Sequence, residues 1–219
     1  MPATTIHFVR HGKVYNPDHL LYERLPDFHL SEQGARMAAA TARFMALNPA
    51  TQAVVAVYAS PLERAQETAQ IIADGMNQMR KSQGRKPLEL MSDERLIEAG
   101  NEFRGQRKDR WPLMALQPAN WSLMSNLMEP SWGESYRAIA ERMRDFAYEQ
   151  VERYPGQQII AVSHESPIWA FRRLLETGKP EHNMLLRHTA LASVTSITFD
   201  VESKNVLGIT YANPASGVQ

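Results

Sequence analysis

The chain has 219 residues, of which 43% are hydrophobic and 22% are charged, and this length favours a single domain over residues 1–219. It contains no cysteine, which excludes disulfide frameworks and cysteine-based zinc sites. Because 24 basic residues balance 24 acidic ones, no overall field draws the chain to nucleic acid or to an anionic membrane. The N-terminal segment lacks the pattern of a secretion signal, and no apolar run approaches the roughly 20 residues that span a bilayer, so we expect a cytoplasmic protein.

The first half of the chain alternates short apolar runs with longer amphipathic ones. These runs predict, in chain order, a strand at 4–9, a helix at 31–48 that begins at Ser31, a strand at 52–59 and a helix at 60–80. The second helix has three start signals, with Ser60 as N-cap, Pro61 at the first helical position and Glu63 completing a capping box.

The second half continues the alternation. It predicts a weaker strand at 88–90, a long helix at 133–154, a strand at 157–163, a helix after Pro167, a strand at 193–200 and a weaker strand at 205–212. This order predicts an α/β layered sheet. Continuous apolarity within the strands at 52–59 and 157–163 is typical of strands that are covered on both faces.

Polar side chains follow three of the predicted strands where each strand ends. They are Arg10 and His11, then Ser60, then Ser163 and His164. Because ligands of open α/β sheets bind outside the carboxyl ends of the strands, we expect these side chains to share one site. Arg64 follows one turn into the helix after Ser60.

These residue types suit the binding and transfer of a phosphoryl group. Arg10, Arg64 and a helix N-terminus form a receptor for a dianion. A neighbouring neutral imidazole can act as nucleophile, because nearby positive charge lowers its pKa from about 6.5. The second histidine can donate to an oxygen of the transferring group. Gly12 has no Cβ that would keep the backbone from the phosphate.

Five motifs carry a family resemblance: "RHGKVYN" (10–16), "DFHLSEQGARMA" (27–38), "SPLERAQET" (60–68), "ERLIEAGNEFRG" (94–105) and "VSHES" (162–166). In this order they resemble the histidine phosphatase superfamily, which includes cofactor-dependent phosphoglycerate mutase. The resemblance runs from residue 6 to about residue 200. It implies a three-layer α/β/α sandwich with a mostly parallel central sheet, like that of phosphoglycerate mutase.

The resemblance also implies roles for single residues. His11 would be the phosphorylated nucleophile. Arg10, Arg64 and His164 would form the rest of the phosphate pocket, with Asn16 as an additional contact. Glu98 would protonate the leaving oxygen and then activate water, a role that needs a carboxyl with a raised pKa.

Two positions depart from the family's pattern. Glu165 follows the second histidine, where the family often has glycine, and it brings a negative charge near the pocket. Glu102 stands where glycine is expected after the acid, so Glu94 and Glu102 stay open as alternatives to Glu98.

Two segments are candidates for contacting the rest of the substrate. The loop at 19–29 offers Tyr22 and Arg24 as substrate-binding residues, and Arg187 or His188 is a further candidate. The segment 111–132 holds three of the four tryptophans and three methionines. It is interpreted as part of an insertion at about 99–132 over or near the active site, as a hydrophobic cluster on the sheet, or as the contact of a homodimer.

The predicted function is metal-independent hydrolysis of a small phosphorylated metabolite through phospho-His11. The nearest alternative is a phosphoglycerate mutase, but "LIEAGNEFRGQR" (96–107) replaces the longer basic stretch of the mutases. An alternative of another class is a non-catalytic phospholigand-binding or scaffold protein. No metal-ligand cluster and no Walker loop appear in the sequence, so we expect no metal and no cofactor. The histidines other than His11 and His164 are expected to be structural or at the surface.

Overall fold

The computed structural model describes residues 2–51, 53–107, 113, 117–121, 133–183 and 186–218. Within these ranges the chain forms a six-stranded sheet in the order β3-β2-β4-β1-β5-β6. The strands are β1 (Ala3–Arg10), β2 (Val54–Ala59), β3 (Leu90–Ser92), β4 (Gln158–Ser163), β5 (Val194–Asp200) and β6 (Val206–Ala212). All six predicted strands are confirmed, including the two weaker ones.

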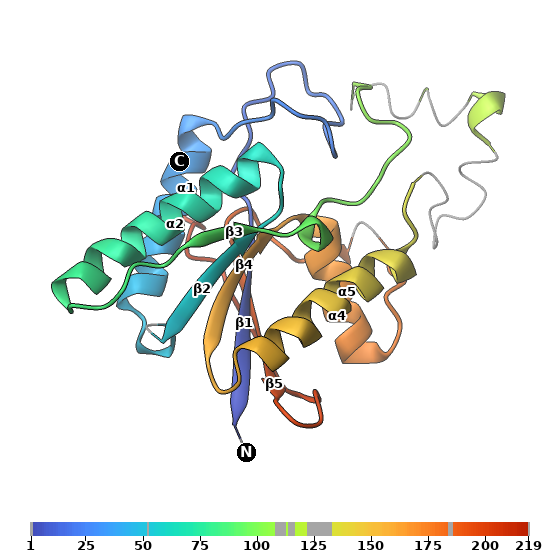
Figure 1. Cartoon of the computed structure of the whole chain (residues 1–219). Coiled ribbons are helices and arrows are strands. Elements are labelled where there is room, and N and C mark those ends of the chain that lie inside the picture. Colours follow the sequence, from blue (N-terminus) through green and yellow to red (C-terminus); the bar gives the residue numbers. More distant parts are fainter. Residues whose placement is uncertain are drawn as a thin grey trace.

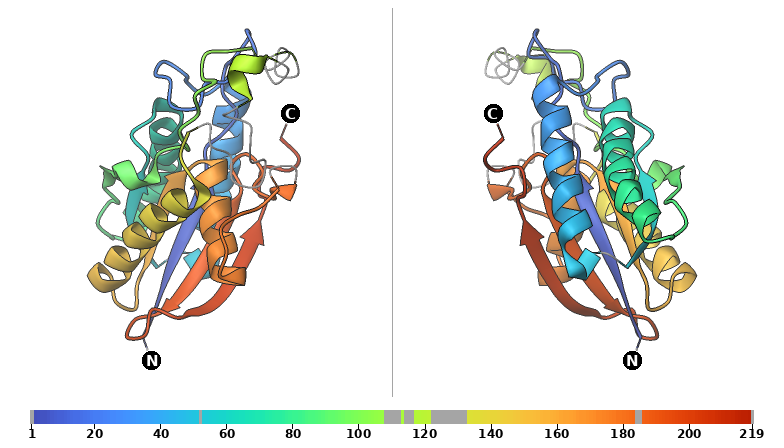
Figure 2. Two further views of the ribbon diagram at one scale, coloured as in Figure 1. Left: turned by 90° about the vertical axis from the view of Figure 1, so that its right-hand side faces the viewer. Right: turned by 90° about the vertical axis from the view of Figure 1, so that its left-hand side faces the viewer.

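The sheet is parallel from β3 to β1 and antiparallel from β1 to β6. β1 and β4 lie in its interior, and β4 is buried from Ile159 to Ser163, as the continuous apolar run predicted. β6 is the opposite case: no residue of this edge strand is fully buried. The β5–β6 hairpin, orange to red in Figure 2, flanks β1.

Helices cover both faces of the sheet (Figure 1). They are α1 (Glu32–Leu47) and α2 (Glu63–Ser82) on one face, and α4 (Tyr136–Arg153) and α5 (Glu165–Thr177) on the other. Met45 and Ile72 pack with Val57 in one core cluster, whereas Phe146 and Phe171 belong to the other. The three-layer α/β/α sandwich is therefore confirmed.

The predicted start of the second helix is wrong. α2 begins at Glu63, with Leu62 as an N-cap that makes no side-chain hydrogen bond. Ser60 instead extends the sheet, since its N–H donates to the Val162 carbonyl at 2.9 Å, and its hydroxyl lies 2.8 Å from Nε2 of His164. The Ser60 hydroxyl thus contacts His164 and does not form the predicted capping box.

The starts of α1 and α5 differ in how well they were predicted. Ser31 caps α1 as predicted, because its hydroxyl accepts from the Gly34 N–H at 3.1 Å. α5 begins at Glu165, before the predicted position, so that Pro167 lies in its first turn. A proline is tolerated there because the first N–H groups of a helix have no intrahelical partner.

Most of the tryptophan-rich segment falls outside the described residues. Of 111–132, only Leu113 and residues 117–121 are described, and Leu113 and Trp121 are 65% and 62% exposed. The insertion over the active site and the homodimer therefore stay predictions. Among the helices of the described ranges, none has the length and apolarity that crossing a bilayer requires.

Candidate active site

The carboxyl ends of three strands lie side by side in the structure. β1 pairs in parallel with β4 so that Arg10 lies opposite Ser163, and β2 pairs with the other edge of β4. The His11 N–H donates to the Ser163 carbonyl at 3.1 Å. The ring centroids of His11 and His164 are 5.0 Å apart. The topology therefore brings the two histidines together, as the sequence predicted.

His11 is held in one tautomer. Its side chain is buried, and Nδ1 lies 2.7 Å from the Gly12 carbonyl. Since a carbonyl only accepts, Nδ1 carries the proton and Nε2 keeps its lone pair. Burial lowers the pKa of His11 well below its ordinary value, and the charges of Arg64 and Arg10 lower it further. At neutral pH His11 is an uncharged imidazole with a nucleophilic Nε2.

Gly12 is needed for a different reason from the predicted one. A Cβ at this position would lie 2.4 Å from the Gly34 carbonyl oxygen in α1, and the Gly12 N–H donates to Thr68 Oγ1 at 3.1 Å. The missing side chain thus lets the loop after β1 pack on α1, and its amide is bound by α2.

His164 occupies the N-cap position of α5 without a side-chain capping hydrogen bond, and it is fully buried. Its Nε2 lies 2.8 Å from Ser60 Oγ, and its Nδ1 makes no hydrogen bond in the structure. Burial lowers its pKa well below the ordinary value, and the charges of His11 and Arg64 lower it further. A dianion beside this ring would act in the opposite direction and favour its protonation.

Arg64 is a fully buried cation. Its Nη2 donates to the Glu23 carbonyl, while Nε and Nη1 have no hydrogen-bond partner among the residues that the structure describes. Its guanidinium carbon lies 4.8 Å from the centroid of the Tyr22 ring. Because buried donors are nearly always hydrogen-bonded, these two nitrogens leave Arg64 with unused capacity to donate hydrogen bonds.

Arg10 is engaged by an acidic neighbour. Its Nη1 donates to Glu165 Oε1 at 2.7 Å and to the Thr189 carbonyl at 2.5 Å. The other oxygen of Glu165 lies 3.9 Å from Nη1 of Arg187. Glu165 therefore bridges two arginines, and its negative charge lies in contact with the predicted phosphate-binding Arg10.

A cavity of about 100 Å³ lies beside His11, and neither Arg64 nor His164 lines it. It is lined by Arg10, His11, Tyr22, Glu23, Glu98 and Glu165. Ligand sites for drug-sized molecules measure about 300–1,000 Å³, so this cavity suits a small group such as a phosphate. A larger hollow of about 680 Å³ on the outer face of α1 contains none of the predicted site residues.

Glu98 is the acidic residue of its segment that reaches the cavity. It is only 9% exposed, whereas Glu94 and Glu102 are exposed and do not line the cavity. Its Oε1 accepts the Ala99 N–H at 2.8 Å. Burial is the main cause that raises the pKa of Glu98; the Ala99 hydrogen bond and the charge of Arg64 oppose it. The geometry thus favours Glu98 among the three candidates for the acid.

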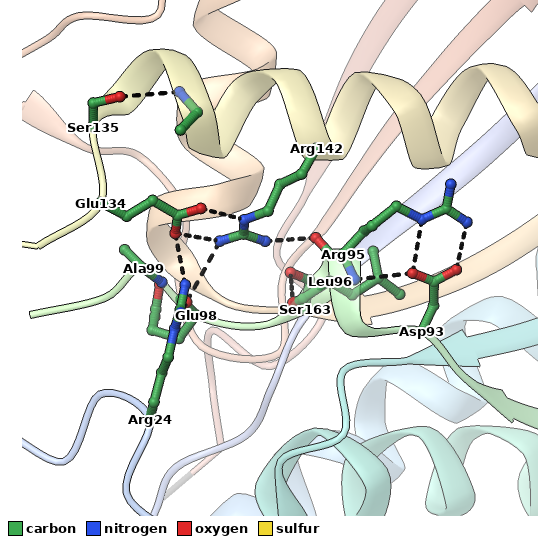
Figure 3. A network of polar contacts seen from close by, with 11 residues as sticks. Arg24, Asp93, Arg95, Leu96, Glu98, Ala99, Glu134, Ser135, Arg142 and Ser163 are labelled. Atoms are coloured by element: carbon green, nitrogen blue, oxygen red, sulfur yellow. Dashed lines mark hydrogen bonds and ion pairs between the residues drawn. The ribbon is translucent and has the colours of Figure 1, made fainter.

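Two predicted ligand contacts are used elsewhere in the structure. The Asn16 side chain binds both the N–H and the carbonyl of Leu20, at 3.0 and 2.9 Å, and so closes its own loop. Arg24 donates to the Glu98 carbonyl at 2.6 Å and to Glu134 at 2.7 Å (Figure 3). Neither Asn16 nor Arg24 lines the cavity, whereas Tyr22 does.

Sequence reasoning missed several residues around the site. Glu23 lines the cavity, Arg142 donates to the Glu98 carbonyl, and Glu134 accepts from Arg142. Glu23 and Glu134 belong to loops without a motif, so no sequence pattern could have identified them. The histidines predicted to be structural or exposed, His7, His19, His29, His182 and His188, do not line the cavity.

No group of three or more histidine, aspartate or glutamate side chains within the described ranges is arranged to hold a metal ion. The site instead places Arg10 and Arg64 beside the two histidines, and arginine donors suit an anion; Glu23, Glu98 and Glu165 also line the cavity.

Comparison with known proteins agrees with the fold. The model of the histidine phosphatase superfamily (branch 1) matches residues 6–211. The chain therefore belongs to the histidine phosphatase superfamily.

Two curated proteins are similar to this chain in sequence. The chain is 40% identical over 217 residues to "Uncharacterized protein Rv0525" of Mycobacterium tuberculosis, covering 99% of this chain and 100% of the relative. It is 28% identical over 158 residues to phosphoserine phosphatase 1 of Hydrogenobacter thermophilus, covering 68% of this chain and 65% of that one.

Solved structures with the same fold include a phosphatase and a mutase. A mycobacterial glucosyl-3-phosphoglycerate phosphatase superposes with a TM-score of 0.74 at 23% identity, covering 96% of this chain and 99% of that one. A phosphoglycerate mutase from Bacillus anthracis gives 0.72 at 20% identity, with 99% and 96% covered. At these identities the likeness establishes the fold.

Proposed function

We propose that the protein is a metal-independent phosphatase that hydrolyses a small phosphomonoester through a phosphohistidine intermediate. Nε2 of His11 attacks phosphorus, and the bond to the leaving oxygen breaks as Glu98 gives that oxygen its proton. Glu98, now a carboxylate, then takes a proton from water, whose oxygen attacks phospho-His11 and releases phosphate. Arg10, Arg64 and His164 stabilise the charge on the transferring group.

The observation that carries this proposal is the state of His11. Its Nδ1 proton is fixed on the Gly12 carbonyl, and two arginines lower the pKa of its ring. A buried structural histidine has no need of two adjacent guanidiniums, since they disfavour its charged form and contribute no hydrogen bond to it. For a nucleophile that receives a dianion they are required, because they bind the incoming phosphoryl oxygens.

The environment of Glu98 supports its role as acid and base. A carboxyl with a raised pKa holds a proton closer to neutral pH and can donate it to a poor leaving group. Exposed Glu94 and Glu102 have no comparable environment. This argument also weighs against a non-catalytic phospholigand-binding protein, for which a buried acid beside the anion would only weaken binding.

Hydrolysis is better supported than the mutase alternative. Three carboxylates, those of Glu23, Glu98 and Glu165, line the small cavity. A phosphoglycerate would bring its own carboxylate close to them, and like charges at short range repel. One curated relative is named as a phosphatase.

The test measures two products from one panel of substrates. Phosphorylated sugars, glycerates and nucleotides are incubated with the protein, and released phosphate and isomerised product are both quantified. Rapid quenching followed by mass spectrometry is expected to find an acid-labile phosphate on the peptide that contains His11. EDTA is expected to leave the rate unchanged. Isomerised product without phosphate release would indicate a mutase, and binding without phosphorylation a phospholigand-binding protein.

A further inference from the structure

The segment that carries Glu98 has no regular hydrogen-bonding pattern of its own. It follows β3 and a short 3-10 turn, η2 (Glu94–Leu96). Side chains from other elements hold its backbone carbonyls instead. Ser163 Oγ donates to the Leu96 carbonyl at 2.7 Å, and Nη1 of Arg142 donates to the Arg95 carbonyl at 2.5 Å. The segment is therefore fixed to the end of β4 and to α4.

Two arginines converge on the carbonyl of Glu98 itself (Figure 3). Nε of Arg24, from the loop after β1, donates to this oxygen at 2.6 Å, and Nη2 of Arg142, from α4, donates at 3.4 Å. Both guanidiniums also bind one carboxylate, since Glu134 lies 2.7 Å from Arg24 and 2.8 Å from Arg142. Glu134 thus balances the two positive charges and holds both arginines on the same carbonyl.

A glycine contact brings Glu134 to this position. Gly133 forms a bridge with Asn101, and a Cβ on Gly133 would lie 2.0 Å from the Gly100 carbonyl oxygen. The Glu134 N–H donates to that same oxygen at 3.4 Å. The segment before α4 therefore runs in direct contact with the residues that follow Glu98.

We propose that Arg24, Glu134 and Arg142 are positioning residues that hold Glu98 in the place where it transfers a proton. We call these three residues the Glu98 clamp. Arg24 and Arg142 donate to the Glu98 carbonyl, and both are bound by Glu134, so they act through the backbone of Glu98. The inference rests on the proposed function, because it assigns the clamp to the acid of that reaction.

The clamp has a clear mechanical consequence. Oε1 of Glu98 is fixed by the N–H of the next residue, Ala99, so the direction of the carboxyl follows the direction of the local backbone. Proton transfer requires a separation of about 2.6–3.2 Å between heavy atoms, and a displacement of about 1 Å can lower a rate roughly 10²-fold. A loosened backbone at Glu98 would therefore weaken proton transfer without touching His11.

The experiment compares two substrates that differ in their need for an acid. The leaving group of p-nitrophenyl phosphate is p-nitrophenolate, which departs without a proton. The leaving group of glycerol phosphate is glycerol, whose oxygen would depart as an alkoxide unless an acid protonates it. In Arg24→Ala and Arg142→Ala, kcat/KM for glycerol phosphate is expected to fall roughly 10- to 100-fold. For p-nitrophenyl phosphate it is expected to change by less than threefold. Glu134→Gln, which keeps the shape and removes the charge, is expected to give the same split if an arginine variant folds poorly.

Arg144→Ala is the matched control. Arg144 lies on the same helix, its side chain is 41% exposed, and its ion pair is with its neighbour Asp145. It is expected to retain both activities. Equal losses on the two substrates in the clamp variants would mean a general structural role, and unchanged rates on both would mean no role. Either result overturns the proposal.

A second readout separates this inference from the proposed function. If the wild-type protein hydrolyses neither substrate, the proposed function fails, and the clamp is then judged by NMR titration of the Glu98 carboxyl. Arg24→Lys keeps the positive charge and removes the Nε donor to the Glu98 carbonyl. It is expected to lower the pKa of Glu98 toward its ordinary value, because a released carboxyl reaches water. Arg144→Ala is expected to leave it unchanged. A Glu98 pKa that does not move in Arg24→Lys overturns the clamp.

Discussion

Replacing Arg64 with methionine tests the anion site most directly. Methionine keeps an unbranched side chain at this position and removes the charge and the donors. Arg64 is fully buried, and only its Nη2 is hydrogen-bonded, to the Glu23 carbonyl. The substitution therefore removes few existing hydrogen bonds, so a large loss of activity would come from the missing interaction with the substrate.

The expected loss follows from the charge. A cation about 4 Å from a developing negative charge contributes on the order of 4 kcal/mol at an effective dielectric constant of 20, and removal of one oxyanion donor lowers kcat by roughly 10²–10³. We therefore expect kcat/KM to fall by roughly 10²–10³. The pKa of His11 is expected to rise, because Arg64 is the charge that lowers it most. The free energy of unfolding is expected to stay equal or increase, since a buried cation without a full set of partners is unfavourable.

Arg80 provides the control within the same helix. It is 8% exposed, and its Nε and Nη1 donate to the Lys86 and Val54 carbonyls at 2.7 and 2.8 Å. Arg80→Met is expected to lower stability and keep full activity, the reverse of Arg64→Met. The assays are kcat/KM for p-nitrophenyl phosphate as a function of pH and unfolding in urea. A rate loss under about threefold in Arg64→Met, or a larger loss of stability than in Arg80→Met, would refute the reasoning.

Other predictions concern the nucleophile, Glu165 and pH. His11→Ala is expected to abolish turnover of an aryl phosphate with an unchanged circular dichroism spectrum; turnover at the wild-type rate would remove the proposed nucleophile. Glu165→Gln is expected to tighten the binding of inorganic phosphate by up to about fivefold in calorimetry, because Glu165 competes for Arg10 and a partly exposed ion pair contributes about 0.2–1 kcal/mol; weaker binding would show that Glu165 positions Arg10. Because the pKa values of His11 and His164 are lowered in the folded protein, the unfolded chain takes up protons first as the pH falls. The free energy of unfolding is therefore expected to decline below about pH 6.5, and His11→Ala should make the decline shallower; equal slopes would contradict this.

The sequence predicted those parts of the site that depend on chain order. His11 and His164 directly follow apolar strands, and parallel strands end at one edge of a sheet, so their meeting could be predicted without coordinates. Arg64 is the second residue of α2, and a side chain at the start of a helix that follows a strand lies near the same edge of the sheet. In each case a local pattern determined the position.

The missed contacts depend on loops and on tertiary packing. Ser60 has the pattern of an N-cap, but its hydroxyl is 2.8 Å from His164, a residue that no local pattern connects with it. Arg24 and Asn16 stand in the loop after β1, where no periodicity indicates the direction of a side chain. Arg24 turns to Glu98, while Asn16 closes its own loop. Such loop contacts are specified only once the whole chain is packed.

The charges of the site also bear on how one carboxyl can serve both steps of the reaction. Burial raises the pKa of Glu98, whereas the nearby arginines lower it. A bound phosphate dianion offsets those arginine charges and adds negative charge of its own, so the pKa of Glu98 rises further when the substrate arrives and the proton is present for the leaving oxygen. Transfer to His11 gives the Glu98 proton away, and the resulting carboxylate beside phospho-His11 is then the base that activates water. In the proposed reaction the substrate itself thus determines the protonation of Glu98, provided that the Glu98 clamp keeps the carboxyl within reach of the bound phosphate.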